Sequence, residues 1–251
     1  MRVLDLDLDF FQSGIVTWPQ GEGRPSSSDH PPWPANRVAV FLESACGLDS
    51  SHLLPGHLAA THDKVFHRWK WQLASGQLVP PFDVVHVDAH ADLSMGNAGW
   101  DHVCFELLHE DSDQRPEAAQ AFVDEGNYLL FAIACRWVRE VTYVYHPEVP
   151  ILDGLPNDLM KLLFRDFDRK SGIIELPSFA PEDRPRGVTE GGVSPIRREP
   201  PVPFCVVSHD ELKAPGPFDF AYLSVSPKYS SPAADSLIEV IGQYVRFDSP
   251  V

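Results

Sequence analysis

The chain has 251 residues, and its 36 acidic side chains outnumber its 20 basic ones, which gives a formal net charge of −16. This balance argues against nucleic acid as the main partner, because phosphate binding needs clustered lysine and arginine. It also argues against binding to an anionic membrane surface. A hydrophobic fraction of 43% is enough for a buried core, and the length favours a single domain over residues 1–251.

The sequence also predicts a compartment. The opening stretch, MRVLDLDLDFF, has acids where a secretion signal needs an apolar segment. No apolar run in the sequence approaches the roughly 20 residues of a transmembrane helix. The cysteines, Cys46, Cys104, Cys135 and Cys205, lack the C-x-x-C spacing of a zinc site and are expected to be buried free thiols. We therefore expect a cytoplasmic protein with no membrane partner.

Strands and helices are predicted to alternate along the chain. In order, the pattern predicts a strand over 3–8, a loop over 18–34, helices over 36–46 and 64–77, a strand over 82–87, a helix over 118–138 broken near Gly126, a strand over 141–145, a helix over 159–165, a loop over 176–204, a strand over 218–225 and a helix over 236–245. Such alternation predicts an α/β fold of three layers, α/β/α, with a mostly parallel central sheet. Ligands bind such folds beyond the carboxyl ends of the strands, so site residues should follow strands directly.

The strongest chemical signal follows the predicted strand over 82–87. Asp88, His90 and Asp92 stand two residues apart, and in an extended chain their side chains would point the same way. Two carboxylates and an imidazole that converge are costly unless a cation neutralises them. Mixed nitrogen and oxygen ligands suit manganese, zinc or iron. The alternative is a solvated strand end with ordinary charges.

A second signal lies in the first predicted strand. Asp5, Asp7 and Asp9 alternate with leucines and would share one face, where their charges repel unless a metal is shared. The alternative is an edge strand with a wet face. An Asp-x-Asp after an apolar strand also resembles the nucleophile motif of haloacid-dehalogenase-type phosphatases, but the Thr or Val and the Gly expected after it are missing here.

A third candidate ligand is His62, just before the predicted helix over 64–77. A lone histidine is more often structural than a metal ligand, and three other histidines lie nearby in the sequence. These competitors are His52, His57 and His67.

Taken together, these motifs resemble a known family. Asp88-Ala-His90-Ala-Asp92 resembles the D-A-H-x-D motif of the ureohydrolases, the arginases, agmatinases and their relatives. Histone-deacetylase-like members of that superfold usually keep the first D-x-H pair and one metal, so Asp92 favours the branch with two metals. Ordinary arginases carry their second acidic motif late in the chain. An early V-L-D-L-D-L-D-F-F, an H-D before a helix and a G-N-Y near residue 127 are instead similar to the peptide arginases, which convert arginine side chains of ribosomally made peptides to ornithine.

The resemblance implies a centre with two Mn²⁺ ions. Its implied ligands are Asp7, Asp9, His62, Asp88, His90 and Asp92. Asp88 and Asp7 would each bridge the ions, and Asp92 would also accept a hydrogen bond from the bridging hydroxide. Asp5 would take the place of a serine beside the ligands; a ligand pair of Asp5 and Asp7 is the alternative.

The resemblance also implies catalytic and substrate-binding residues. His102, in Gly99-Trp-Asp101-His102, is similar to the F-D-H histidine of agmatinases and would give a proton to the leaving amine. Asn127 and Glu125, in Glu125-Gly-Asn127-Tyr128, are predicted to lie near the substrate. The alternatives are a surface histidine for His102 and a helix cap for Asn127.

One departure from the family concerns the guanidinium group. Arginases bind it with the glutamate of an E-V-N-P motif on the last strand, where this chain has Ser224-Val-Ser226-Pro227. Ser224 is thus predicted at the substrate site, but another acid must hold the positive charge. The unranked candidates are Glu43, Asp101, Glu106 and Glu125.

The resemblance therefore implies an arginase–deacetylase-like fold and a binuclear manganese hydrolase. Its substrate would be an arginine-containing precursor peptide, converted to ornithine with release of urea. One alternative is a ureohydrolase acting on a free small guanidine such as agmatine or arginine. Another is a catalytically silent metal-binding module of the same fold.

Overall fold

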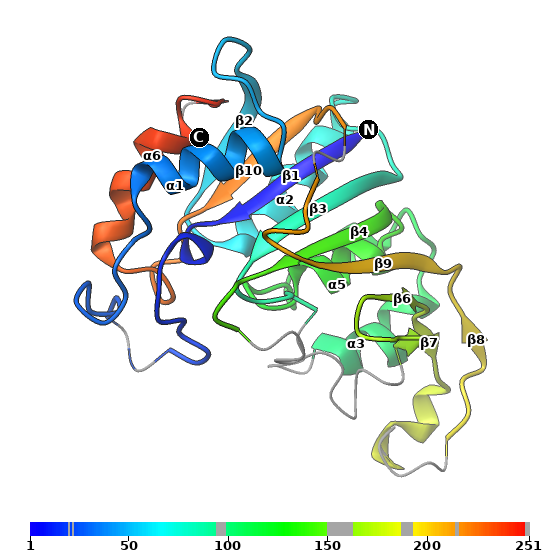
Figure 1. Cartoon of the computed structure of the whole chain (residues 1–251). Coiled ribbons are helices and arrows are strands. Elements are labelled where there is room, and N and C mark those ends of the chain that lie inside the picture. The colour runs from blue at the N-terminus through cyan, green and yellow to red at the C-terminus, as the bar shows by residue number, and fades with distance from the viewer. Residues whose placement is uncertain are drawn as a thin grey trace.

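A single large sheet runs through the centre of the computed structural model, which describes residues 1–19, 21, 23–93, 99–149, 163–186, 193–213 and 216–248 (Figure 1). The sheet has nine strands, which lie in the order β11 (Val245–Phe247), β2 (Leu54–Ala59), β10 (Phe220–Ser224), β1 (Arg2–Asp7), β3 (Phe82–Asp88), β4 (Val138–Tyr145), β9 (Val202–Ser208), β6 (Ser171–Ile174) and β5 (Phe164–Arg165). From β11 to β9 all neighbours are parallel, whereas β6 and β5 add an antiparallel edge. The predicted α/β class with a mostly parallel sheet is confirmed.

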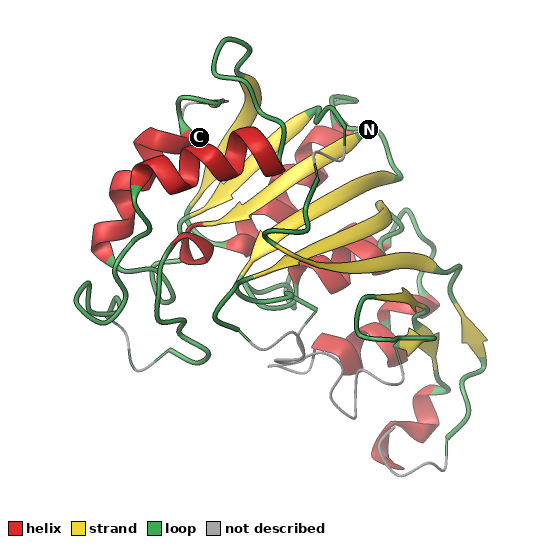
Figure 2. Cartoon of the chain, viewed as in Figure 1, coloured by secondary structure: helices red, strands yellow, loops and turns green. Residues whose placement is uncertain are grey.

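Helices cover both faces of this sheet (Figure 2). One face carries α1 (Ala35–Val40), its π-helical continuation η2 (Phe41–Ala45) and α6 (Ser236–Ile241). The other carries α2 (His62–Ala74), α3 (Gly99–Phe105), α4 (Arg115–Ala118) and α5 (Tyr128–Ala134). Short 3-10 turns are η1 (Leu8–Phe11), η3 (Leu107–His109), η5 (Pro181–Arg186) and η6 (Pro232–Asp235), and β7 (Pro177–Ser178) pairs with β8 (Arg197–Arg198). Within the described ranges, every helix is too short or too polar to cross a membrane.

The two faces of the sheet have separate hydrophobic cores, because side chains alternate along each strand. In β1, Leu4 and Leu6 belong to the core under α1 and α6, while Val3 belongs to the core under α2 and α5. In β3, Val85 belongs to the core under α1 and α6, and Val84 belongs to the core under α2 and α5. The same alternation turns the polar residues at the ends of these strands toward the α2–α5 layer.

Several predicted elements match the structure closely. The strands predicted over 3–8, 82–87, 141–145 and 218–225 are β1, β3, β4 and β10, and the helices predicted over 36–46 and 64–77 are α1 with η2 and α2. The predicted loop over 18–34 contains no helix or strand among its described residues. Three cysteines are buried as expected, but Cys205 is partly exposed; all are free.

Two predicted helices are shorter than expected, because part of each predicted segment forms a strand of the sheet. In the segment 118–138, α4 ends at Ala118, α5 covers only Tyr128–Ala134, and Val138 already begins β4. Likewise α6 ends at Ile241, and Val245 begins β11. Valine is β-branched and packs well in a strand, so helical spacing alone misassigns it.

Other errors concern segments rich in proline and glycine. The predicted loop over 176–204 contains β7, β8 and the start of β9, which joins the main sheet. Strand β2 was not expected either, since Leu-Pro-Gly-His-Leu-Ala reads as a turn. Its Gly56 is needed, because a Cβ there would lie 2.3 Å from Val245 Cγ1. Strand β6 and helix α3 were also missed. Of the helix predicted over 159–165, residues 159–162 lie outside the described residues, and Phe164–Arg165 form β5.

Helix α2 offers a direct test of this packing. Trp69 is fully buried, whereas Trp71 on the same helix is half-exposed and stacks on Arg68 at 4.4 Å. Trp69→Ala should lower the free energy of unfolding by about 3–5 kcal/mol, because it leaves a large cavity. Trp71→Ala should cost less than about 1 kcal/mol, since it removes only an exposed contact. Urea unfolding of both variants measures this, and equal losses would contradict the assigned orientation of the helix.

Candidate metal centre

The carboxyl ends of β1 and β3, which are neighbours in the sheet, carry the predicted metal ligands. Strand β1 ends at Asp7, whose Oδ1 accepts a hydrogen bond from the Asp9 N–H at 2.9 Å. Strand β3 ends at Asp88, whose Oδ1 accepts one from the His90 N–H at 2.8 Å. Both segments thus turn at their first ligand. Asp5 and Asp7 share one face of β1 as predicted, but Asp9, His90 and Asp92 follow tight turns rather than an extended chain.

Four of the predicted ligands form a first group around His62, the first residue of α2. All four side chains are buried. The distances from His62 Nδ1 are 3.1 Å to Asp7 Oδ2, 3.2 Å to Asp88 Oδ2 and 2.8 Å to Asp92 Oδ2. Asp92 reaches this position with a left-handed backbone, at φ 46°. Asp7 is held from the other side by the hydroxyl of Ser226, which donates to its Oδ2.

A second group lies beside the first and shares Asp88 with it. His90 Nδ1 lies 3.2 Å from Asp9 Oδ2 and 3.5 Å from Asp88 Oδ1. The two oxygens of Asp88 are therefore directed to different histidines, so Asp88 belongs to both groups. In each of the sets Asp7–His62–Asp88 and Asp9–Asp88–His90, one ligand atom per residue lies within 4.8 Å of the others. The structure brings all six predicted ligands into one cluster, in which every side chain except that of His90 is buried.

Asp5, the alternative ligand, lies one layer behind this cluster. Its Oδ2 is 3.1 Å from His86 Nδ1 and accepts a hydrogen bond from the Tyr128 hydroxyl. Its Oδ1 is 3.8 Å from His62 Nε2, the nitrogen that points away from the ligand group. This geometry favours Asp7 and Asp9 as the ligand pair, with Asp5 orienting His62 from behind. Its full burial and existing partners also speak against Asp5 as a phosphatase nucleophile.

His86 and Tyr128 belong to the site but were missed from the sequence. His86 is two residues before Asp88 on the same face of β3, and its Nε2 donates to the His90 carbonyl at 3.1 Å. The ring of Tyr128, the first residue of α5, stacks on that of His62 at 4.8 Å. The period of two in Val-Val-His-Val-Asp would have identified His86. No sequence signal places Tyr128 against His62.

Electrostatics in the metal-free cluster favour bound protons. Burial, with the charges of Asp9 and Asp88, raises the pKa of Asp7 well above its ordinary value. Burial and the charge of Asp88 raise the pKa of Asp92 to about 6. Although burial opposes it, surrounding carboxylates raise the pKa of His62 and of His90 well above the ordinary value. Such a buried excess of acid is costly unless protons or cations balance it.

The donor set fits a metal ion. It combines imidazole nitrogens with carboxylate oxygens, which suit ions such as manganese, iron or zinc. Among the described residues, Asp9 Oδ1 is buried without a hydrogen-bond partner, so the protein itself leaves this oxygen unsatisfied. The cluster could therefore hold a metal ion.

His102, the predicted proton donor, lies on α3. Its Nδ1 is 3.1 Å from Glu106 Oε2, and its ring stacks on Phe122 at 3.6 Å. Its Nε2 is buried and has no hydrogen-bond partner in the described part of the chain. Within these ranges the contacts of His102 do not include the six ligands, so the structure does not join it directly to the cluster.

The three predicted substrate-binding residues have different surroundings. Ser224 ends β10 in register with Asp7, so it borders the cluster, and its hydroxyl is buried without a partner among the described residues. Asn127 Oδ1 accepts from the Asp124 N–H at 2.8 Å, and its Nδ2 donates to the Phe122 carbonyl at 3.1 Å. Asn127 thus closes the turn before α5. Glu125, in the same turn, lies 3.6 Å from Lys228.

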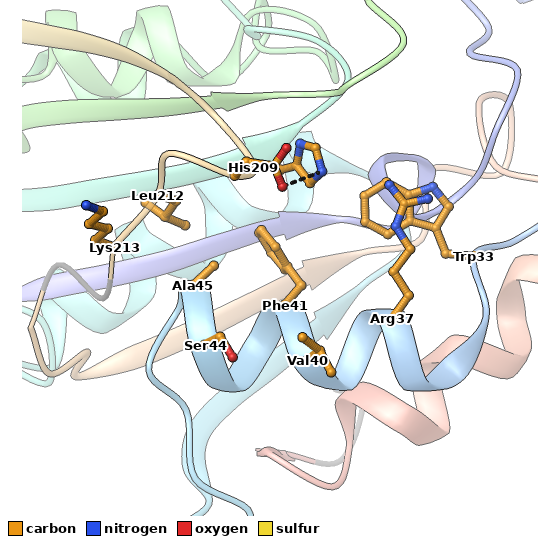
Figure 3. Close-up of a pocket in the computed structure, with 10 residues that line it drawn as sticks. Trp33, Arg37, Val40, Phe41, Ser44, Ala45, His209, Leu212 and Lys213 are labelled. Atoms are coloured by element: carbon orange, nitrogen blue, oxygen red, sulfur yellow. Dashed lines mark ion pairs between the residues drawn. The ribbon is translucent and has the colours of Figure 1, made fainter.

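A groove of about 390 Å³ lies elsewhere on the molecule, between α1 with η2 and the segment that follows β9 (Figure 3). Its lining includes Phe41, His209 and Lys213, with Arg37 stacked over the Trp33 ring at 3.4 Å. None of the six metal ligands lines it, so this groove and the metal cluster are separate features.

Comparisons of the chain with protein-family models, with curated proteins and with solved structures find no match. The function must therefore be argued from the geometry of the cluster and from the sequence motifs that form it.

Metal binding should stabilise the folded protein. A ligand that binds only the folded state at 100 times its Kd adds about 2.7 kcal/mol to the free energy of unfolding. Mn²⁺ should therefore raise the unfolding temperature of the wild type, and Asp88→Asn should remove most of the increase because Asp88 serves both groups. Asp210→Asn is the matched control, since Asp210 is exposed. An equal Mn²⁺ effect in both variants, read by thermal unfolding, would place the metal elsewhere.

The stability of the metal-free protein should fall as the pH rises. Asp92, with its pKa raised to about 6, holds a proton in the folded state that the unfolded state has already lost. His62 and His90, with raised pKa values, contribute stability that is lost as the pH rises through those values. Between about pH 5 and about pH 8 the free energy of unfolding of the metal-free protein should therefore fall as these groups lose their protons. Metal binding displaces the same protons, so stabilisation by Mn²⁺ should grow with pH. Thermal unfolding across this range, in EDTA and in Mn²⁺, measures both trends. A metal-free unfolding temperature that rises with pH, or a stabilisation by Mn²⁺ that shrinks with pH, would refute them.

Proposed function

We propose that this protein is a binuclear manganese hydrolase of the arginase–deacetylase superfold, acting on arginine side chains of a precursor peptide. The observation that carries the proposal is that the two carboxylate oxygens of Asp88 face different histidines. One lies 3.2 Å from His62 Nδ1 and the other 3.5 Å from His90 Nδ1. A carboxylate shared between two nitrogen- and oxygen-rich groups matches the D-A-H-x-D motif of that superfold. The reaction is addition of water to the guanidinium carbon and cleavage of the bond to the ornithine nitrogen, which yields ornithine and urea.

In this mechanism the chain would hold two Mn²⁺ ions, which supply hydroxide near neutral pH by lowering the pKa of a shared water. His62 and Asp92 would hold one ion and His90 and Asp9 the other, and Asp88 and Asp7 would contribute further carboxylates to the same centre. Asp92, whose Oδ2 faces the first group, would also accept the hydrogen bond that orients the attacking water.

The leaving nitrogen of ornithine needs a proton. His102 is the proposed donor, because it is similar to the F-D-H histidine of agmatinases; its Nε2 is buried and has no hydrogen-bond partner among the described residues, and its Nδ1 lies 3.1 Å from Glu106 Oε2.

Two other functions compete with this one. A ureohydrolase for free agmatine or arginine would use the same cluster; the early acidic motif, similar to that of the peptide arginases, favours a peptide instead. A silent metal-binding module would have no need for buried Asp92 beside His62, since keeping a further carboxylate in such a cluster is costly.

Mass spectrometry separates these possibilities. An arginine-containing peptide incubated with the Mn²⁺-loaded protein should lose CH₂N₂, the difference between arginine and ornithine. Asp88→Asn should reduce the rate at least about 100-fold, the upper range for groups that only support ligands, while Asp210→Asn should retain it. Turnover of agmatine without turnover of peptides would favour the small-guanidine enzyme. Mn²⁺ binding without turnover of either would favour the silent module.

A further inference from the structure

A buried guanidinium group needs a carboxylate partner, and the structure separates the acids that could provide one. Glu43 accepts a hydrogen bond from the Tyr244 hydroxyl at 2.7 Å, in the α1–α6 layer away from the cluster. Asp101 and Glu106 both pair with the guanidinium of Arg184. These three acids already have partners of their own. Glu125 is the remaining candidate.

Glu125 carries an oxygen that the protein leaves unsatisfied. Its Oε2 is buried and has no hydrogen-bond partner among the described residues, while its Oε1 lies 3.6 Å from Lys228 Nζ. The turn that carries it is well held, since Gly126 N–H donates to Asp124 Oδ1 at 3.1 Å and Asn127 Oδ1 accepts from Asp124 N–H at 2.8 Å. The next residue after this turn is Tyr128, which stacks on the ligand His62 at 4.8 Å. The Glu125 turn is therefore anchored to the metal cluster.

The turn that carries Lys228 is anchored to the cluster from the opposite side. Ser226 donates to the ligand Asp7, and Gln12 Nε2 donates to the Tyr229 carbonyl at 2.7 Å. The ring of Tyr229 meets that of the ligand His90 edge to face, with 4.9 Å between centroids.

We propose that Glu125 and Tyr229 form the subsite for the substrate guanidinium, and that Lys228 occupies the place of that cation in the free protein. This inference rests on the proposed function. An arginine side chain would displace Lys228, because a planar guanidinium can bind both carboxylate oxygens, including the unsatisfied Oε2, whereas an ammonium acts as a point charge. Tyr229 would add an aromatic face for the same cation. Lys228, half-exposed already, would move into solvent.

Lys228 then acts as an internal competitor, with a consequence for specificity. Glu125 and Lys228 should have opposite effects on KM. Removing the carboxylate weakens substrate binding, whereas removing the lysine frees the carboxylate for substrate.

The experiment uses the full chain loaded with Mn²⁺ and the arginine peptide of the mass-spectrometric assay. Glu125→Gln should raise KM about 10- to 100-fold, the range expected for a hydrogen-bonded charge. Lys228→Met should lower KM several-fold, and in the Glu125→Gln background it should have no effect. Glu211→Gln is the matched control, because Glu211 forms an exposed ion pair with Lys170 at 3.1 Å, and it should leave KM unchanged. An unchanged KM in Glu125→Gln, or a raised KM in Lys228→Met, overturns the proposal.

Calorimetric binding of agmatine to the same variants separates this inference from the proposed function. If the wild type binds agmatine through Glu125 but modifies no peptide, the subsite stands and the peptide activity fails. If peptides are modified and Glu125→Gln binds and turns over normally, the activity stands and the subsite fails. A wild type that neither binds agmatine nor turns over peptide would overturn both the subsite and the proposed function. Thermal unfolding of each variant confirms that it is folded.

Discussion

Asp88 is the residue on which the candidate site depends. It is fully buried at the end of a central strand, and each of its oxygens faces a different histidine. Burial alone would raise its pKa, but hydrogen bonds from His62 and His90 hold the pKa of Asp88 well below its ordinary value. It is therefore the fixed negative charge around which the other groups are arranged. Their raised pKa values show the cost of that arrangement without a cation.

The parallel sheet makes this arrangement possible. Strands β1 and β3 are adjacent and run in the same direction, so Asp7 and Asp88 reach the same edge of the sheet. Helices α2 and α5 begin at that edge and contribute His62 and Tyr128. The side chains of this cluster lie over an apolar core and are largely buried, so their charges interact strongly. A cluster of this kind is suited to hold divalent cations.

Two turns lie beside the cluster, where the proposed substrate would bind. The turn before α5 carries Glu125, and the turn after β10 carries Lys228 and Tyr229, each tied to a different ligand by a ring contact or a hydrogen bond. An acid with one unsatisfied oxygen and a displaceable lysine would suit a cation with two parallel donors. The net charge of −16 is consistent with such a substrate and does not identify it.

The sequence by itself determined the α/β class and the two apolar strands that end at Asp7 and Asp88, because both are local patterns. The six candidate ligands were implied by the resemblance of its acidic motifs to those of the ureohydrolases, and the structure brings these residues together. The strands β2, β6 and β9 could not be predicted, because proline, glycine and exposed positions obscure their hydrophobic patterns. The helix predicted over 118–138 is longer than the helices that the structure has there. Only the tertiary structure placed Asp5 behind His62, brought in His86 and Tyr128, and paired Glu125 with Lys228. These contacts join residues from 57 positions apart, for Asp5 and His62, to 123 positions apart, for Asp5 and Tyr128, and no local spacing encodes them.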